Sequence, residues 1–259
     1  DLNGNQAADP GDSVTYTDTL VNVGPADLFS LQLLDTLDAN TAQVPGTVKT
    51  TPLAFNDSYQ SLGNVGIDVP AANGLLANDA DLENQLLAGP PPLNTGLTVT
   101  AFDALSAQGG QVMVSPNGGF TYIPPAGYEG DDTFSYTIQD ADGNQDRGVV
   151  TIQVAEVIWF IDNTAGSAGD GRLGSPFNSL AGFVSNAADE AGDIVFLYSG
   201  SGAYTGGITL LNNQILIGQG VDLATGAGIT PPSYSRTLPS TGTNPTITNA
   251  AGNGITLAQ

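Results

Sequence analysis

Cysteine and histidine are both absent from the 259-residue sequence. The chain therefore has no disulfide, no thiolate nucleophile, no Ser-His-Asp or Cys-His arrangement and no ordinary zinc site. Long apolar runs are missing as well, since no segment approaches the roughly 20 apolar residues that a membrane-spanning helix needs. These absences remove much familiar enzyme chemistry, and we expect a protein that is not an enzyme and does not insert into membranes.

Positive charge is also scarce. Four Lys and Arg residues stand against 26 Asp and Glu residues, which gives a net charge of -22. Such a chain repels nucleic acid and anionic membranes. Clustered carboxylates without basic partners either repel one another or share a metal ion, and oxygen ligands suit calcium. The composition therefore predicts Ca²⁺ as a partner and no nucleic acid.

Glycine (34 residues) and proline (16 residues) separate short runs of alternating Val, Ile, Thr, Tyr and Phe. This pattern is typical of an all-β protein, and the length allows two or three modules. No signal peptide follows Asp1, so we expect an internal stretch of a longer protein. Strands are predicted at 13–23, 28–33, 97–102, 111–115, 120–123, 133–139 and 148–154.

The last third of the chain has a different pattern. A short amphipathic helix is predicted over 175–191, opened by Ser175 and Pro176, with an apolar face of Phe177, Leu180, Ala181, Val184 and Ala188. The run DIVFLY at 193–198 predicts a strand buried on both faces. Short strands at 207–211, 214–218 and 253–257, with Asn or Gly corners, suit the coils of a solenoid, and 226–245 is expected to be a loop from one coil.

Three stretches carry family resemblances. Residues 1–53, with the motif DPGDSVTYTDTLVNVG, resemble part of the conserved repeat domain of bacterial surface proteins. Residues 54–155 resemble the cadherin-like, immunoglobulin-type repeats of secreted bacterial adhesins through AFNDSY, GLLANDADLE and GGFTYIPPAGYEGDDTFSYTIQDADGN. Residues 156–220, with VIWFIDNTAGSAGDGRLGSPFNSLAGF and NNQILIGQG, resemble the helix-capped start of a right-handed parallel β-helix related to pectate lyases, and this truncated module is expected to span 156–259.

These resemblances imply an architecture and a role. The expected fold is all-β, with immunoglobulin-like β-sandwich modules followed by the first coils of a parallel β-helix. The expected role is structural or adhesive, as a calcium-stiffened rod or extracellular fibre segment of a large secreted bacterial cell-surface protein. Neighbouring modules, other copies of the chain and surface glycans are left open as partners.

A first candidate calcium loop lies at the start of the chain. Its polar residues occupy positions 1, 3, 5, 9 and 12 of a twelve-residue loop, which are the side-chain ligand positions of an EF-hand loop. Glycine stands at loop position 4 instead of 6, and the last ligand is Asp instead of Glu, so a solvated polar turn is the alternative. The candidate ligands are Asp1, Asn3, Asn5, Asp9 and Asp12.

A second candidate calcium site combines three acidic turns of 54–155. Loops that are distant in sequence gather at one pole of a sandwich, so these turns could converge, and the resemblance implies that they bind calcium there. Separate solvated turns are the alternative, because Asp-Ala-Asp-Gly is also a good hairpin sequence. The candidate ligands are Asn56, Asp57, Asn78, Asp79, Asp81, Glu83, Asp140, Asp142 and Asn144.

Two further interpretations remain open. The β-helix could continue into a polysaccharide lyase or glycosidase whose active site lies outside this segment, because no carboxylate of 156–259 recurs at a coil spacing. Alternatively, an unfinished sandwich or an open solenoid end could pair with another copy of the chain. Aromatic residues in the last third could stack on sugars, although core packing is the more common use; they are Trp159, Phe160, Tyr198 and Tyr204.

Overall fold

The computed structural model describes residues 49–81 and 94–257. The predicted strands at 13–23 and 28–33, and nearly all of the expected module 1–53, lie outside these residues. Residues Gln43–Gln259 form one compact unit, which contains every described helix and strand. No helix within the described ranges is long and apolar enough to span a membrane.

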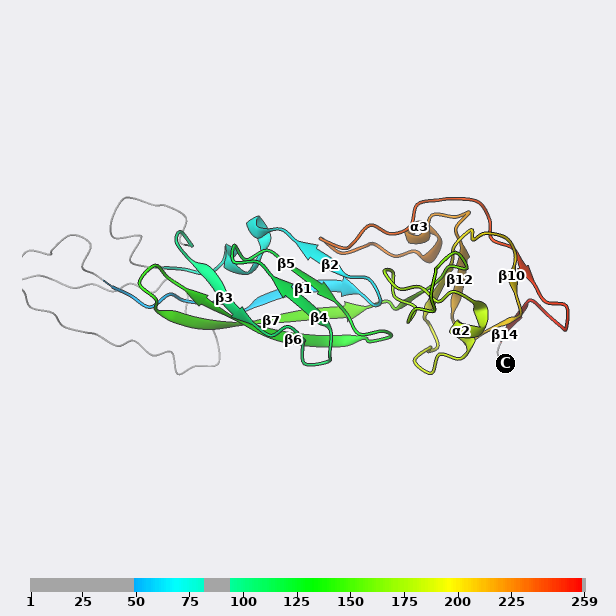
Figure 1. Cartoon of the computed structure of the whole chain (residues 1–259), viewed down its shortest axis with the longest axis horizontal. Coiled ribbons are helices and arrows are strands. Elements are labelled where there is room, and N and C mark those ends of the chain that lie inside the picture. Colours follow the sequence, from blue (N-terminus) through cyan, green and yellow to red (C-terminus); the bar gives the residue numbers. More distant parts are fainter. Residues whose placement is uncertain (1–48, 82–93, 258–259) are drawn as a thin grey trace, which may run out of the picture. The chain divides into compact units, whose positions relative to one another are not determined.

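A β-sandwich occupies residues 57–155 (Figure 1). One sheet has the strand order β1-β7-β6-β3 and the other has the order β2-β5-β4. All pairings are antiparallel except the pairing of β1 with β7, which is parallel. The elements are β1 (Asp57–Leu62), β2 (Ile67–Val69), β3 (Thr98–Phe102), β4 (Gln111–Val114), β5 (Phe120–Ile123), β6 (Gly130–Gln139), β7 (Gln145–Ala155), and the 3₁₀ turns η1 (Ala71–Asn73) and η2 (Leu75–Ala77).

Alternating side chains build the core of this sandwich. In β6, Phe134, Tyr136 and Ile138 are buried, and the residues between them are only partly buried. Strand β7 shows the same alternation, and both strands face a cluster that includes Phe120 and Tyr122 of the opposite sheet. The expected strands at 97–102, 111–115, 120–123, 133–139 and 148–154 are confirmed, and β6 and β7 are longer than predicted.

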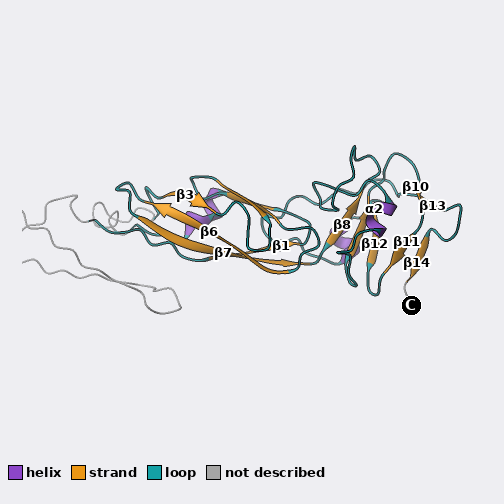
Figure 2. Ribbon diagram, turned by 60° about the horizontal axis from the view of Figure 1, so that its bottom comes forward, coloured by secondary structure: helices purple, strands orange, loops and turns teal. Residues whose placement is uncertain are grey.

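Parallel strands dominate the remaining part of the chain (Figure 2). One sheet has the order β12-β9-β8, and two further pairs join β10 with β13 and β11 with β14. None of these sheets closes on itself in the part of the chain that the structure covers. The strands are β8 (Ile158–Ile161), β9 (Ile194–Leu197), β10 (Tyr204–Thr205), β11 (Ile208–Leu210), β12 (Ile215–Gly218), β13 (Ile247–Thr248) and β14 (Ile255–Leu257).

Every residue of β8 and of β9 is buried, which confirms the expected doubly buried strand near 193–198. The parallel register places similar side chains side by side, with Ile158 opposite Ile194 and Phe160 opposite Phe196. The rings of Phe160 and Phe196 lie 6.1 Å apart in an edge-to-face arrangement. The expected strands near 207–211, 214–218 and 253–257 are present as β11, β12 and β14.

The predicted helix at 175–191 was wrong in its length and its buried face. Helix α2 covers only Leu180–Val184, and the Ser179 side chain caps it by accepting a hydrogen bond from the Gly182 amide. It cannot begin at Ser175, because the backbone of Phe177 pairs with β8. Phe183 is buried instead of Val184, which is 53% exposed.

Most of the predicted loop at 226–245 has no regular structure. Helix α3 (Leu223–Ala227) overlaps its start, capped by Asp222 at one end and by Gly228 at the other. From Gly228 to β13 the chain contains no helix or strand, although Ser235 forms an isolated bridge.

Candidate functional site

Three acidic turns of the sandwich meet at the end where β1 begins. The first turn precedes β1, the second surrounds Asp79 and the third is 140–144. Leu53 forms an antiparallel bridge with Ala80, with N–H···O distances of 2.7 and 3.0 Å, and so joins the first turn to the second. The Ala54 amide donates to Oδ2 of Asp146 at 2.9 Å, which connects the first turn to the start of β7. We call the carboxylates Asp57, Asp79, Asp81 and Asp146, together with the turn 140–144, the acidic pole.

Asp79 is the buried centre of the acidic pole, with 1% of its surface exposed. Its Oδ1 accepts a hydrogen bond from the Phe55 amide at 2.8 Å. The hydroxyl of Tyr136 lies 3.2 Å from both carboxylate oxygens and 2.8 Å from the carbonyl oxygen of Phe55. A tyrosine carries a single hydroxyl proton, so it cannot donate to the carbonyl and to the carboxylate at once.

Asp57 lies beside Asp79 at the first residue of β1. Its Oδ2 is buried and has no hydrogen-bond partner. Burial raises the pKa of Asp57 to about 7, against the opposing effect of hydrogen bonds from Tyr136 and Asn78. Burial also raises the pKa of Asp79 to about 7, and the charge of Asp57 adds to this rise. Two carboxylates in one partly dry site resist being ionised together unless a cation joins them.

Asp146 is a member of the acidic pole that the sequence analysis missed. Besides the Ala54 amide, it accepts the Arg147 amide through Oδ1 at 2.8 Å, and its charge raises the pKa of Asp79. It lies two residues after Asn144 in the motif DADGNQD, so the alternation of acidic residues in this hairpin was the available signal.

In the turn 140–144, both carboxylate oxygens of Asp140 accept hydrogen bonds from the turn itself. Oδ1 of Asp140 accepts the amides of Asp142 and Asn144 at 2.9 and 2.8 Å, and its Oδ2 accepts Nδ2 of Asn144 at 2.9 Å. Asp142 forms an ion pair with Lys49, and Asn144 also donates to the Thr50 carbonyl at 3.5 Å. The turn therefore holds the chain segment that enters the sandwich.

The remaining candidate ligands differ in how deeply they are buried. Asp81 is buried, whereas Asn56 and Asn78 are exposed. Oδ1 of Asn56 accepts the Val149 amide at 3.0 Å, and Nδ2 of Asn78 donates to the Asn56 carbonyl at 3.3 Å. Among the residues in the described ranges, no group of three or more carboxylates is arranged to hold a metal ion. The other candidate ligands fall outside those ranges: Asp1, Asn3, Asn5, Asp9, Asp12 and Glu83.

Comparison with known proteins finds a family match for the part of the chain that carries the acidic pole. Residues 49–153 match the family model of the bacterial Ig domain. Bacterial Ig domains are often extracellular or surface modules, so this match indicates a surface or structural module. No curated protein matches the chain. This match covers most of the sandwich of residues 57–155, and we use "the Ig domain" as a short label for that part of the chain.

The Ig domain shares a hydrophobic core with the segment that follows it. Leu62, the last residue of β1, and Val65, in the turn after it, are buried in one cluster with Ile158, Phe160 and further residues of the parallel sheet. Between them, Gly63 approaches the next segment so closely that a Cβ atom there would lie 2.8 Å from the Cα atom of Val157. We call this region the module junction.

Hydrogen bonds at the module junction fix the same turn. The carbonyl of Gly63 accepts the Ile158 amide at 3.2 Å, and the carbonyl of Asn64 accepts the Leu173 amide at 2.9 Å. Oδ1 of Asn64 accepts the Gly127 amide at 2.8 Å from within the Ig domain. Asn64 has a positive φ of 66°, a conformation that asparagine tolerates better than most residues. The turn therefore joins both sides of the junction through packing and through the backbone.

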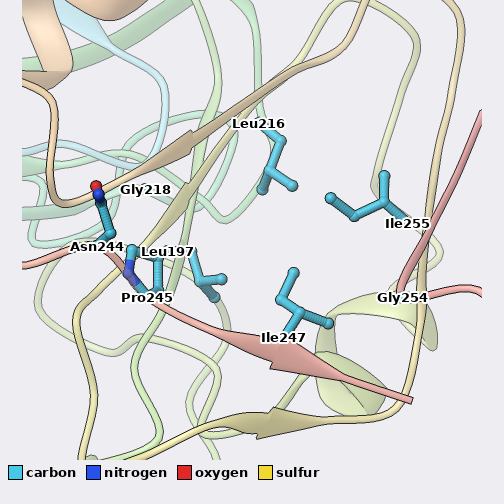
Figure 3. A pocket seen from close by; sticks show the side chains of 8 residues that line it. All are labelled: Leu197, Leu216, Gly218, Asn244, Pro245, Ile247, Gly254 and Ile255. Atoms are coloured by element: carbon cyan, nitrogen blue, oxygen red, sulfur yellow. The ribbon is translucent and has the colours of Figure 1, made fainter. Parts of the chain in front are cut away.

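The last third of the chain contains an apolar pocket of about 490 Å³. The side chains of Leu197, Leu216, Ile247 and Ile255 point toward one another inside it (Figure 3). Asn244 is the polar side chain of its lining, which also includes Gly218, Pro245 and Gly254. The pocket is thus lined mainly by aliphatic side chains.

The aromatic residues that could have stacked on sugars are mostly core residues. Trp159 and Phe160 are fully buried and Tyr204 is 2% exposed. Tyr198 is partly buried and packs its ring 5.1 Å from that of Phe196. The core interpretation is confirmed for Trp159, Phe160 and Tyr204.

Proposed function

We propose that this chain is a structural segment of a large secreted bacterial surface protein, in which calcium stiffens the modules of a rod or an extracellular fibre. The match to a bacterial Ig domain supports the structural role. The shared core at the module junction supports a rod, because it restricts motion between consecutive parts of the chain. In this proposal, the parallel strands β8 to β14 are the first coils of a β-helix.

One observation carries the calcium part of the proposal: Asp57 and Asp79 lie together with raised pKa values, and Oδ2 of Asp57 is buried without a partner. The donors at this pole are carboxylate, carbonyl and amide oxygens, which are the ligands that calcium prefers. A bound Ca²⁺ would give the orphaned oxygen a partner and would relieve the repulsion between the two carboxylates. Asp57 and Asp79 are the carboxylates that we propose as ligands of the ion, and Asp146, whose charge raises the pKa of Asp79, is a near neighbour.

The position of the acidic pole suits a stiffening role. Residues 49–57 enter the Ig domain there, tied down by the Lys49–Asp142 ion pair and by the Leu53–Ala80 bridge. An ion bound only by the folded state stabilises that state by RT ln(1 + [L]/Kd), where [L] is the free ion concentration. Calcium at this pole would thus stabilise the entry segment and the sandwich together.

The test uses Tb³⁺ luminescence and thermal unfolding. Tb³⁺ replaces Ca²⁺ at oxygen sites and is sensitised by nearby tyrosine, and Tyr136 lies 3.2 Å from the Asp79 carboxylate. We expect Ca²⁺ to raise the melting temperature and to displace Tb³⁺, and both effects to weaken in Asp57→Asn and Asp79→Asn. The control is Asp131→Asn, which removes the same charge from an exposed position on β6. Equal Tb³⁺ and Ca²⁺ responses in all four proteins would contradict a calcium site at this pole.

A further inference from the structure

Strand β2 lies at one edge of the β2-β5-β4 sheet. One side of β2 pairs with β5 through the Ile67–Tyr122, Asp68–Thr121 and Val69–Phe120 registers. The backbone groups on the other side of an edge strand can pair with any extended segment that reaches them. An uncovered edge could therefore pair with a strand of another chain.

Residues from the last third of the chain cover that edge. Ser235 forms an antiparallel bridge with Ile67. The Asp68 amide donates to the Tyr234 carbonyl at 2.9 Å, and the Arg236 amide donates to the Gly66 carbonyl at 2.9 Å. The segment thus pairs with the edge through one antiparallel bridge and two backbone hydrogen bonds, although 168 positions separate Asp68 from Arg236.

Side chains strengthen this backbone pairing. The guanidinium of Arg236 contacts Asp68, with Nη2 at 3.0 Å and Nε at 3.2 Å from Oδ1. The ring of Tyr234 lies 6.5 Å from that of Tyr59, edge to face, and packs against the core of the Ig domain. Tyr234 has a φ of 67°, and a non-glycine residue keeps such a conformation only where its surroundings hold it.

Both ends of the segment are anchored in the parallel-strand part of the chain. Ile229 and Leu238 pack against the cluster that contains Phe160 and Phe196. After Leu238, the Gly242 amide donates to the Gln219 carbonyl at 2.7 Å, directly after β12. A segment with two fixed ends that also pairs with β2 connects the Ig domain to the coils at a second place, apart from the module junction.

We propose that residues 230–238 are a strap that pairs with the open edge of β2 and clamps the Ig domain to the parallel-strand segment. The clamp relies on backbone pairing, a two-nitrogen ion pair and a tyrosine contact, so it needs no calcium. It also occupies the β2 edge, which would otherwise accept a strand from another chain. This inference is independent of the acidic pole, which lies where β1 begins.

Hydrogen exchange measured by NMR on the full chain in EDTA tests the strap. In the wild type, we expect the amides of Asp68 and Arg236 to exchange far more slowly than in an unstructured peptide, because the strap accepts one and the edge of the Ig domain accepts the other. Exchange of the Asp68 amide at the rate of an unstructured peptide would overturn the proposal.

Two strap variants and one control sharpen the test. Arg236→Pro removes both the amide donor and the guanidinium, and we expect the Asp68 amide to exchange more than tenfold faster. Arg236→Ala removes only a partly exposed ion pair, for which we expect a rise of about two- to fivefold. The control Arg147→Ala breaks the Arg147–Asp103 pair, 3.9 Å long and also exposed, within the Ig domain, and should leave Asp68 exchange unchanged.

Fluorescence of Trp159, the single tryptophan, verifies that each variant is folded, because this side chain is fully buried. Unchanged Asp68 exchange in a folded Arg236→Pro variant would show that the strap does not hold the edge. Faster exchange in Arg147→Ala, equal to that in Arg236→Ala, would show that charge alone causes the effect and would also overturn the proposal.

Discussion

The indole Nε1 of Trp159 donates a hydrogen bond to Oδ2 of Asp193 at 2.7 Å. Trp159 lies in the middle of β8 and Asp193 directly precedes β9, and both side chains are buried. The same oxygen of Asp193 accepts the Glu190 amide at 2.9 Å. Burial raises the pKa of Asp193 in spite of these bonds, with further increases from the charges of Glu129 and Glu190.

This pair predicts different effects for two substitutions. Asp193→Leu leaves the indole N–H and the Glu190 amide without an acceptor, and we expect a loss of about 2 kcal/mol or more in the free energy of unfolding. Asp193→Asn keeps an acceptor and removes a buried charge, so it should lower the free energy of unfolding less than Asp193→Leu does. Its cost should be smallest above neutral pH, where the wild-type carboxylate is ionised. Urea unfolding followed by Trp159 fluorescence measures both, and equal losses at pH 8 would contradict this explanation.

The carboxyl pair of Asp57 and Asp79 predicts a pH dependence that calcium removes. Both pKa values are raised from 3.8 to about 7 in the folded state. The stability that these groups contribute is therefore fully present below about pH 4 and is lost as the pH rises to about 7. In EDTA we expect the melting temperature to fall between pH 5 and pH 8, and less steeply in Asp57→Asn.

Calcium should offset that fall, because it binds the ionised carboxylates. The melting temperature at pH 8 should rise with Ca²⁺ in the wild type and rise less in Asp57→Asn. The exposed variant Asp131→Asn serves as the control for the general effect of one lost charge. If Asp57→Asn and Asp131→Asn change the pH slope equally, the pair has no special role.

The shared core predicts that the Ig domain and the parallel strands unfold together. Leu62 is 4% exposed within the cluster of Phe160 and Phe196, and Leu62→Ala should cost about 2–5 kcal/mol. The unfolding midpoint measured by Trp159 fluorescence and the midpoint measured by far-ultraviolet circular dichroism should shift by the same amount in this variant. Met113→Ala, at a side chain 72% exposed, should change stability by less than about 0.5 kcal/mol. Two separate transitions in Leu62→Ala would contradict joint unfolding.

Asp132 predicts a large loss from a single substitution inside the Ig domain. Its carboxylate is fully buried and accepts the hydroxyls of Ser106 and Tyr122 and the amides of Gln108 and Thr133. Asp132→Ala removes the acceptor of these four donors, which include the buried Tyr122 hydroxyl, and we expect a cost of at least about 3 kcal/mol in the free energy of unfolding. The neighbouring exposed variant Asp131→Ala is the control, and a similar small loss in both would refute the role of this network.

The sequence predicted the strands of the Ig domain well where alternation was strong. The strand at 120–123 has the predicted bounds, because the buried Phe120 and Tyr122 alternate with the less buried Thr121 and Ile123 and a glycine turn precedes them. Strand β1 was not predicted, since its sequence DSYQSL has only two large apolar residues. It forms because β7 provides a parallel partner for all six of its residues, which is a long-range contact that local pattern does not encode.

Tertiary contacts also explain the error in the helix and the absence of Asp146 from the predicted acidic site. The apolar spacing from Phe177 onward suggested one long helix, but pairing of the Phe177 backbone with β8 delays its start to Leu180. The convergence of Asp57 with Asp79 followed from sandwich topology and from family resemblance. The role of Asp146 and the self-capped turn of Asp140 depend on hydrogen bonds that sequence spacing alone does not specify. The candidate loop at 1–12 and the role of Glu83 stay predictions.

The parallel pairing of β1 with β7 has a consequence for tension along the polypeptide. The chain enters the Ig domain at the start of β1 and leaves it at the end of β7, and the two strands run side by side in the same direction from Asp57–Val150 to Leu62–Ala155. A pull on the two ends slides these strands past each other, so it loads their hydrogen bonds simultaneously in shear. An antiparallel pair pulled from adjacent ends would instead unzip one bond at a time.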